Sequence, residues 1–401
     1  MGRRQGATLT AAPSATRWAA VGHSTDPDPV RAGKDAAGKA IGDRDAKLVI
    51  AFCAISYDLE ALLCAINDRC GGAPLIGCTT AGEIAADGPS DGGVVVTALG
   101  GDGFAVRTAA ATGASERLRE LGSDVASCAT ELEGGPHRVL MLLTDGVAGD
   151  QKEIIRGVHS VVGSGMPLVG GCAGDGLEMK QTFQLHGSEV ITDGVVAAAI
   201  ASDAPIGLGW SHGWERVGEP MLVTRSDNNR VYEIDDKPAL DTYLERLGAP
   251  AEARTDAAEF TKWARRRPLG LGQRRTGQEP VRCVNDASFE DRSIGCTAEV
   301  PQGGMAWFMR GDGDSILRST VSACEAAAGT LDGEPPRAVI TFDCIGRRGV
   351  LGEGGIGVEV ERITESFPGV PVSGLYTYGE IARTRGVNAV HSQTLVALAF
   401  G

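Results

Sequence analysis

Three acidic residues follow glycine-rich turns that resemble one another along the chain. Glu83 ends the motif Gly-Cys-Thr-Thr-Ala-Gly-Glu, which begins at Gly77, and Glu380 ends a matching motif, Gly-Leu-Tyr-Thr-Tyr-Gly-Glu, which begins at Gly374. A third copy is one residue shorter and ends at Asp175. In a partly desolvated cleft such carboxylates would hold a ligand ammonium through charge-assisted hydrogen bonds. Alternatively, each acid accepts backbone N–H groups of its own turn and only fixes the loop.

Two arginines, Arg347 and Arg348, follow an apolar run that ends at Cys344. A guanidinium at a strand end can hold a carboxylate through two parallel N–H···O bonds, and open α/β sheets bind ligands at strand ends. A surface ion pair explains the same residues equally well. An acid for an amine and an arginine for a carboxylate are what a small zwitterion requires. The candidate ligand-binding residues are Thr79, Thr80, Glu83, Asp175, Arg347, Tyr376 and Glu380.

The cysteines and histidines carry weaker signals. Ten cysteines include no CxxC pair, and six histidines form no HxH or HExxH. Cys78, Cys172 and Cys344 stand in the repeated segments, but no histidine lies close in sequence to activate them, and they lack the paired spacing of metal ligands. We expect small buried hydrophobic side chains at these positions. We therefore predict no catalytic residue and no metal site, and a cysteine-dependent enzyme is the least favoured alternative.

The acidic motifs stand in three segments with one layout. The segments run over residues 48–99, 139–200 and 338–400, and the third is separated from the second. Each has an apolar run, a helical pattern, a short apolar run introduced by proline, the acidic turn and a last apolar run. This order predicts a strand–helix–strand crossover. We predict an α/β fold of two mixed-sheet domains with crossover helices, partly related by this internal repeat.

A different pattern separates the second and third segments. Apolar runs at residues 221–224 and 231–234 flank a polar turn, which predicts a hairpin, and residues 237–248 predict a helix. We place a domain boundary near Gly218. The predicted organisation is a disordered tail over residues 1–17, a first domain over 18–218 and a second over 219–401.

Composition limits the partners and the compartment. The 401 residues contain 38 Lys and Arg against 52 Asp and Glu, a formal net charge of −14. This charge argues against nucleic acid or an anionic membrane surface as a partner. The N-terminus has no apolar signal segment, and no apolar run approaches the ~20 residues that span a bilayer. We predict a soluble cytoplasmic protein with reduced thiols.

The ordered set of motifs resembles the FIST proteins, a bacterial sensory module made of FIST-N and FIST-C parts. The matching motifs lie at residues 77–84, 143–146, 170–175, 223–243, 342–347 and 376–381 and cover the chain from about Trp18 to the C-terminus. The resemblance implies a FIST-N-like domain over residues 18–218, a FIST-C-like domain over 219–401, and a cytoplasmic signal-transduction input domain that binds small ligands, with amino acids proposed.

The resemblance also carries alternatives. A subset of the family is thought to bind haem for nitric-oxide sensing, and His186 and His212 are the least implausible ligands here. Related domains in F-box proteins suggest a non-catalytic adaptor or scaffold. No cofactor is otherwise expected. Because residues 1–17 and the end at Gly401 leave no room for an output domain, we expect a separate signalling partner such as a kinase or cyclase.

Overall fold

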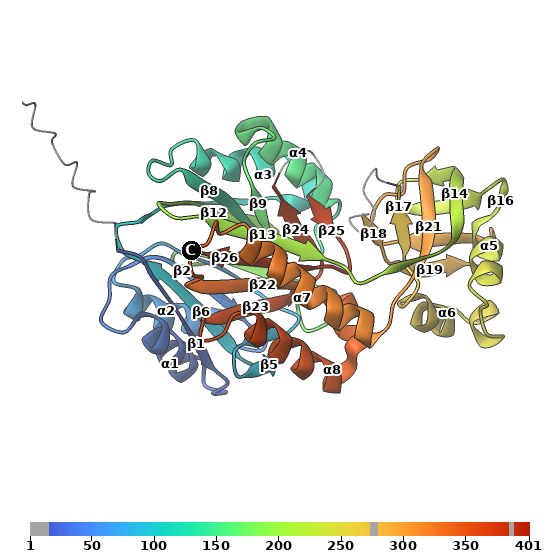
Figure 1. Ribbon diagram of the computed structural model, residues 1–401. Helices are drawn as coiled ribbons and strands as arrows, with labels where there is room; N and C mark the ends of the chain where they lie inside the picture. The colour runs from blue at the N-terminus through green and yellow to red at the C-terminus, as the bar shows by residue number, and fades with distance from the viewer. Residues whose placement is uncertain (1–15, 273–279, 385–388) are drawn as a thin grey trace, which may run out of the picture.

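The chain forms a mixed α/β structure, as the sequence predicts. The computed structural model describes residues 16–272, 280–384 and 389–401. Three six-stranded sheets form a core, and a fourth sheet belongs to a lobe that projects from this core (Figure 1). No helix in the described part of the chain is long and apolar enough to cross a membrane.

The first core sheet sets the pattern for the other two. Its strand order is β1 (Trp18–Ser24), β6 (Val94–Gly100), β2 (Ala46–Cys53), β3 (Leu75–Thr79), β10 (Phe183–His186) and β11 (Glu189–Thr192). Strands β2 and β3 are parallel, and every other neighbouring pair is antiparallel. A helix connects the parallel pair, because parallel strands need a crossover rather than a hairpin.

The other two core sheets repeat this order. The second contains β7 (Phe104–Thr112), β12 (Gly194–Ser202), β8 (His137–Thr144), β9 (Leu168–Cys172), β24 (Glu380–Arg383) and β25 (Val390–His391). The third contains β13 (Ile206–Ser211), β26 (Leu395–Phe400), β22 (Ala338–Cys344), β23 (Val372–Thr377), β4 (Glu83–Ala85) and β5 (Gly88–Ser90). Each again has one parallel pair, β8 with β9 and β22 with β23.

The last hairpin of each sheet comes from another segment of the chain. The hairpin β10–β11 of the second segment completes the first sheet, β24–β25 of the third completes the second, and β4–β5 of the first completes the third. The exchange is cyclic, so each segment both gives and receives a hairpin. The three acidic turns are the connections through which the chain leaves one sheet for the next.

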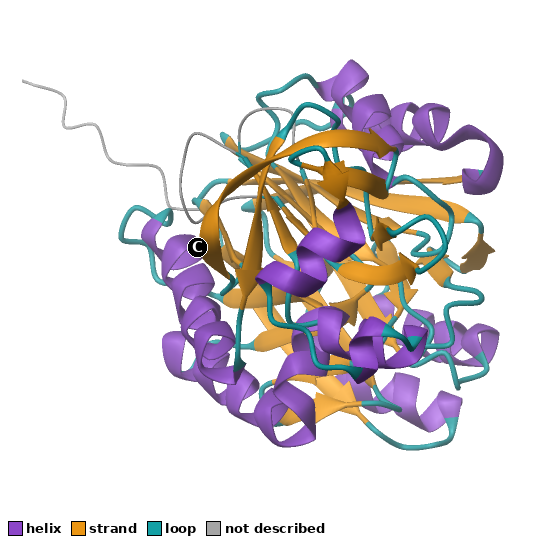
Figure 2. Ribbon diagram, turned by 90° about the vertical axis from the view of Figure 1, so that its right-hand side faces the viewer, coloured by secondary structure: helices purple, strands orange, loops and turns teal. Residues whose placement is uncertain are grey.

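Two helices cover the outer face of each core sheet (Figure 2). They are α1 (Pro29–Ile41) and α2 (Leu59–Cys70), α3 (Ala114–Ala126) and α4 (Gln151–Val162), and α7 (Gly313–Gly329) and α8 (Ile345–Ser366). Aspartates cap several of them; Asp58 and Asp150 accept backbone N–H groups at the starts of α2 and α4. The inner faces of all three sheets share one hydrophobic core, in which the rings of Phe52 and Phe342 lie 6.0 Å apart.

The inserted lobe lies in the chain between β13, the edge strand of the third core sheet, and α7, which covers that sheet. It consists of β14 (Glu215–Asp227), β15 (Arg230–Ile234), β16 (Lys237–Pro238), α5 (Ala239–Arg246), α6 (Ala257–Ala264), β17 (Leu269–Leu271), β18 (Val281–Arg282), β19 (Val284–Ser288), β20 (Ser293–Cys296) and β21 (Met305–Arg310). The hairpin β14–β15 and helix α5 confirm the predicted hairpin and helix. The lobe has its own core, centred on Tyr243, Phe260 and Phe308.

The sheets pair across the predicted domain boundary. Gly218 lies inside β14, and the pairs β4–β23, β9–β24 and β13–β26 each join residues from both sides of it. The division into residues 18–218 and 219–401 therefore stays a proposal, and it concerns two stretches of sequence whose strands pair with each other. Most of the predicted tail, residues 1–15, lies outside the described residues.

Candidate ligand-binding site

Most of the residues that line one surface crevice belong to the first segment, which contains the first acidic turn. The crevice has a volume of about 390 Å³ and lies at the carboxyl ends of the parallel strands β2 and β3, where α/β sheets bind ligands. We call it the acidic crevice. It is lined by Ala54, Ile55, Ser56, Thr80, Ala81, Gly82, Glu83, Asp91, Asp175, Gly176, Leu177 and Arg348.

Glu83 forms part of the crevice floor and has no exposed surface of its own. Its Oε1 accepts from Thr80 Oγ1 at 2.5 Å, and its Oε2 accepts from Ser90 Oγ at 3.0 Å and from the Gly93 amide at 2.9 Å. Burial raises the pKa of Glu83 to about 7, although these hydrogen bonds lower it and nearby Asp91 raises it further. The carboxyl group therefore changes charge near neutral pH.

Arg348, from the first turn of α8, also lines the crevice. Its Nη2 donates to Asp91 Oδ2 at 2.7 Å, and its Nη1 donates to the Ala81 carbonyl at 2.9 Å. The guanidinium carbon lies 5.0 Å from the centre of the Tyr376 ring. This arginine already has a carboxylate partner, so it adds little positive charge to the crevice.

The loop between β9 and β10 forms another wall. Asp175 Oδ2 accepts the Lys180 and Gln181 amides at 2.7 and 3.0 Å, and its Oδ1 accepts the Met179 amide at 2.9 Å. Leu177 and Met179 in this loop have φ of 79° and 53°, a left-handed conformation that bulky residues rarely adopt, and each is 56% exposed. Asp175 thus holds a strained, exposed loop over the crevice, and such strain is concentrated at ligand sites.

The charges around the crevice do not balance. Three carboxyl groups, Glu83, Asp91 and Asp175, and one guanidinium, Arg348, line it among the described residues. Hydrogen bonds from Tyr378 and backbone amides outweigh burial at Asp175 and hold the pKa of that carboxyl below its ordinary value. The crevice therefore carries a net negative charge at neutral pH, which grows as Glu83 ionises.

Two predicted site residues lie beneath this surface. Thr79 is buried, and its Oγ1 accepts the Phe183 amide at 3.1 Å, which ties β3 to the exchanged strand β10. Tyr376 is buried under Arg348, and its hydroxyl has no hydrogen-bond partner among the described residues. Both support residues of the crevice and do not line it.

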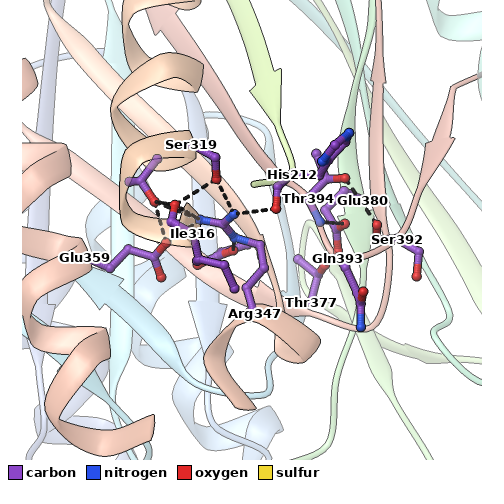
Figure 3. Close-up of polar contacts among 12 residues, drawn as sticks. His212, Ile316, Ser319, Arg347, Glu359, Thr377, Glu380, Ser392, Gln393 and Thr394 are labelled. Carbon is purple, nitrogen blue, oxygen red and sulfur yellow. Dashed lines mark hydrogen bonds and ion pairs between the residues drawn. The ribbon is translucent and has the colours of Figure 1, made fainter. Parts of the chain in front are cut away.

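Glu380 repeats the contacts of Glu83 in the third segment. Its Oε1 accepts from Thr377 Oγ1 at 2.9 Å, and its Oε2 accepts the Thr394 amide at 3.0 Å (Figure 3). Burial raises the pKa of Glu380 to about 8. Glu380 does not line the acidic crevice, so the structure does not bring it together with Glu83 and Asp175. Its contacts are those of an acid that fixes its own turn.

Arg347 lies in a buried ion-pair cluster instead of at a surface. Its Nε donates to Asp343 Oδ1 at 2.7 Å and its Nη2 to Glu359 Oε1 at 2.5 Å, and none of these three side chains is exposed. Ser319 and Thr320 of α7 accept from the same guanidinium at 2.7 Å (Figure 3). With every nitrogen engaged, Arg347 is not available to a ligand carboxylate in this arrangement.

Asp91 is a charged crevice residue that the sequence analysis does not single out. It precedes Gly92 and Gly93 in the turn before β6. The one feature of the sequence that could have indicated Asp91 is its closeness to the acidic turn of the same segment. Of the two adjacent arginines that the sequence offers as carboxylate ligands, Arg348 lies in the crevice.

Cys78, Cys172 and Cys344 of the repeated segments are buried. Burial raises the pKa of Cys172 to about 12 and the pKa values of Cys78 and Cys344 well above their ordinary range. The thiolate is the nucleophile, so these thiols are poorly suited to attack near neutral pH. Within the described residues, no group of three His, Cys, Asp or Glu side chains is placed to hold a metal ion.

The two proposed haem ligands each have a polar neighbour close to a ring nitrogen. His186 Nε2 lies 3.1 Å from Thr108 Oγ1, and His212 Nδ1 accepts the Trp214 amide at 2.9 Å. Neither histidine lines any of the five cavities described for this structure. The haem alternative therefore gains no support at these positions.

Comparison with known proteins adds an independent line of information. A sequence model of the FIST N domain matches residues 47–237, and one of the FIST C domain matches residues 239–383. Uncharacterized proteins from two strains of Mycobacterium tuberculosis are 26% identical over 391 residues, which cover 93% of this chain and 97% of theirs. An uncharacterized protein of Methanocaldococcus jannaschii is 34% identical over 82 residues, 20% of this chain and 16% of its own length.

Proposed function

The chain belongs to the FIST family of signal-transduction sensory domains, and from this premise we propose that it senses a small ammonium-bearing molecule, an amino acid or similar zwitterion, in the acidic crevice. The observation that carries the proposal is the charge of the crevice. Asp91 neutralises Arg348, while within the described part of the chain Asp175 and the ionisable Glu83 have no cationic partner. A ligand ammonium would supply the missing charge.

The size and exposure of the crevice suit such a ligand. A volume of about 390 Å³ falls within the ~300–1,000 Å³ range of small-molecule sites. The polar groups at its edge are the Ser56 hydroxyl, the Asp91 carboxylate and the Arg348 guanidinium, which is 11% exposed. Together they offer acceptors for an ammonium and one donor for a carboxylate.

Calorimetric titration of the full chain with amino acids and their deaminated counterparts, such as L-alanine and propionate, tests the proposal. The amine-bearing member should bind and propionate should not bind at this site. Because an ammonium favours the ionised form of Glu83, affinity should rise between pH 6 and pH 8. In Glu83→Gln the affinity should fall at least tenfold and lose this pH dependence.

Glu380→Gln is the matched control. Glu380 makes the same turn contacts and is equally buried, but it lies outside the crevice. The proposal predicts normal binding in this variant. If no amine in the panel binds, or if both variants lose binding equally, Glu83 has only a role in fixing its turn and the proposal is wrong.

The remaining expectations stay predictions. All ten cysteines are free, which supports a reducing compartment such as the cytoplasm. An output partner such as a kinase or cyclase, an adaptor role and a catalytic role each need evidence of their own. The family makes a sensor the first hypothesis, and the high thiol pKa values weigh against a cysteine-dependent enzyme.

A further inference from the structure

A second cleft lies where the inserted lobe meets the core. It has a volume of about 400 Å³. The core contributes the loop from β8 to α4, the end of β9 and the segment around β25, and the lobe contributes the β14–β15 turn, Arg282 and the segment after β20. We call it the interlobe cleft. Ligand sites occur preferentially at such joints between structural units.

Direct contacts fix the two walls to each other. Lys152 of α4 pairs with Glu299 of the lobe at 2.7 Å, and the hydroxyls of Thr297 and Ser392 lie 3.1 Å apart. A ligand in the cleft would therefore touch groups whose relative placement is already set, which lowers the entropic penalty of binding.

Arg282 is buried in the lobe wall and has no carboxylate partner among the described residues. It is 5% exposed, its Nε donates to the Glu299 carbonyl at 3.0 Å, and its Nη1 donates to the Val281 carbonyl at 3.0 Å. Among the described residues no carboxylate lies within ion-pair distance of it, and its Nη2 donates no hydrogen bond. Burial lowers the pKa of this guanidinium. A buried charge without a counter-charge is costly, so an anion placed here would be strongly stabilised.

On the core wall, Gln151 offers a hydrogen-bond acceptor that has no donor among the described residues. Its Nε2 donates to the Asp145 carbonyl at 2.9 Å, which fixes the orientation of the amide. Its Oε1 is buried and accepts no hydrogen bond from the described residues. A buried acceptor of this kind favours a ligand that brings a donor.

The other charged groups limit the charge of the ligand. Asp150 also lines the cleft, Glu299 is paired with Lys152, and burial lowers the pKa of His391 to about 4, so this histidine is neutral near pH 7. Arg282 is the one lysine or arginine among the described lining residues, so the cleft can neutralise one negative charge, which favours a monoanion over a dianion such as phosphate.

We propose that the interlobe cleft binds a small monocarboxylate with a hydrogen-bond donor on the adjacent carbon, a 2-hydroxy or 2-amino acid. The carboxylate pairs with Arg282, and the donor serves Gln151 Oε1. This site is separate from the acidic crevice and does not depend on it. A ligand in the interlobe cleft would contact both the core and the inserted lobe, so its binding would favour the present placement of the lobe.

Calorimetry of the full chain with L-lactate, propionate, lactamide, L-alanine and inorganic phosphate tests the proposal. L-lactate should bind, propionate about tenfold more weakly, and lactamide and phosphate much more weakly than either. L-alanine measured in Glu83→Gln distinguishes an amine donor in this cleft from binding in the acidic crevice. Lactamide or phosphate binding as tightly as lactate would overturn the proposal.

Variants in the cleft locate the binding. Asn228→Asp adds a negative charge at an exposed position in the β14–β15 turn and should weaken lactate at least tenfold, whereas Asn285→Asp, an equal change on the same lobe outside the cleft, should not. Gln151→Met should remove the preference for lactate over propionate and leave propionate binding. Unchanged lactate binding in Asn228→Asp would place the site elsewhere.

Discussion

The Tyr378 hydroxyl donates to Asp175 Oδ1 and accepts the Leu177 amide at 2.9 Å. Asp175 lines the acidic crevice, whereas Tyr378 lines the interlobe cleft, so this pair of residues stands between the two sites. The contact also joins the second acidic turn to the third across 203 positions of sequence.

Tyr378→Phe should loosen the loop that covers the acidic crevice. Removal of the hydroxyl leaves the Leu177 amide and one carboxylate oxygen of Asp175 with fewer partners, so we expect a loss of about 1–3 kcal/mol in the free energy of unfolding. Urea denaturation measures this loss. Tyr376→Phe is the matched control: its hydroxyl is buried without a partner among the described residues, so its removal should be neutral or stabilising. Equal effects of the two changes would contradict this assignment.

Glu83→Gln should change how stability depends on pH. Glu83 has a folded-state pKa of about 7 against an ordinary value of 4.5, so the folded protein retains a proton that the unfolded chain loses. Its contribution to stability is present below pH 4.5 and disappears as the pH rises through 7. The stability of Glu83→Gln relative to wild type should therefore increase across this window, on the order of 3 kcal/mol. Denaturation at pH 5 and pH 8 gives the two differences, and a constant difference would exclude the raised pKa.

Arg347→Ala should destabilise the fold without acting on a ligand directly. It leaves Asp343 and Glu359 buried without their cation, a change that typically costs about 3–5 kcal/mol. Arg362→Ala, which breaks an exposed pair with Glu365, should lose less than about 1 kcal/mol. Chemical denaturation compares the two. A small loss in Arg347→Ala, accompanied by weaker amino-acid binding, would instead indicate that Arg347 contacts the ligand.

The adjacent arginines illustrate how far the sequence can take the site. Both follow a strand, but helix α8 starts at Ile345, and consecutive helical residues point about 100° apart. One arginine therefore faces the core and the other the crevice, and the sequence alone does not say which. The acidic turns were predictable because glycine and acid recur in order. The exchange of hairpins between the sheets was not predictable, because the alternating pattern of a strand does not specify which sheet edge the strand pairs with.

Thiol reactivity should separate one cysteine from the others. Cys64 on α2 is exposed, whereas the other nine cysteines are buried. Iodoacetamide should modify the folded protein rapidly at one thiol, and Cys64→Ser should remove this phase. Mass spectrometry of the native protein counts the modified sites. Rapid modification of Cys78 or Cys172 would reveal an accessible thiolate and would support the hypothesis of a cysteine-dependent enzyme.

Gly174→Ala tests the crossing of the first two acidic turns, on which the crevice depends. The Gly174 amide donates to the Thr79 carbonyl at 3.0 Å, and an added Cβ would lie 2.6 Å from the Ala81 nitrogen. Because backbone atoms cause this clash, the loop must shift, with an expected loss of about 1–3 kcal/mol and weaker binding of the amine in the acidic crevice. Gly165→Ala, whose Cβ meets nothing within 4 Å, is the control for replacing glycine by alanine. Denaturation and titration of both variants test whether amine binding requires the close contact between these two turns. Unchanged binding in a destabilised Gly174→Ala would show that the crevice tolerates a displaced loop and would contradict this dependence.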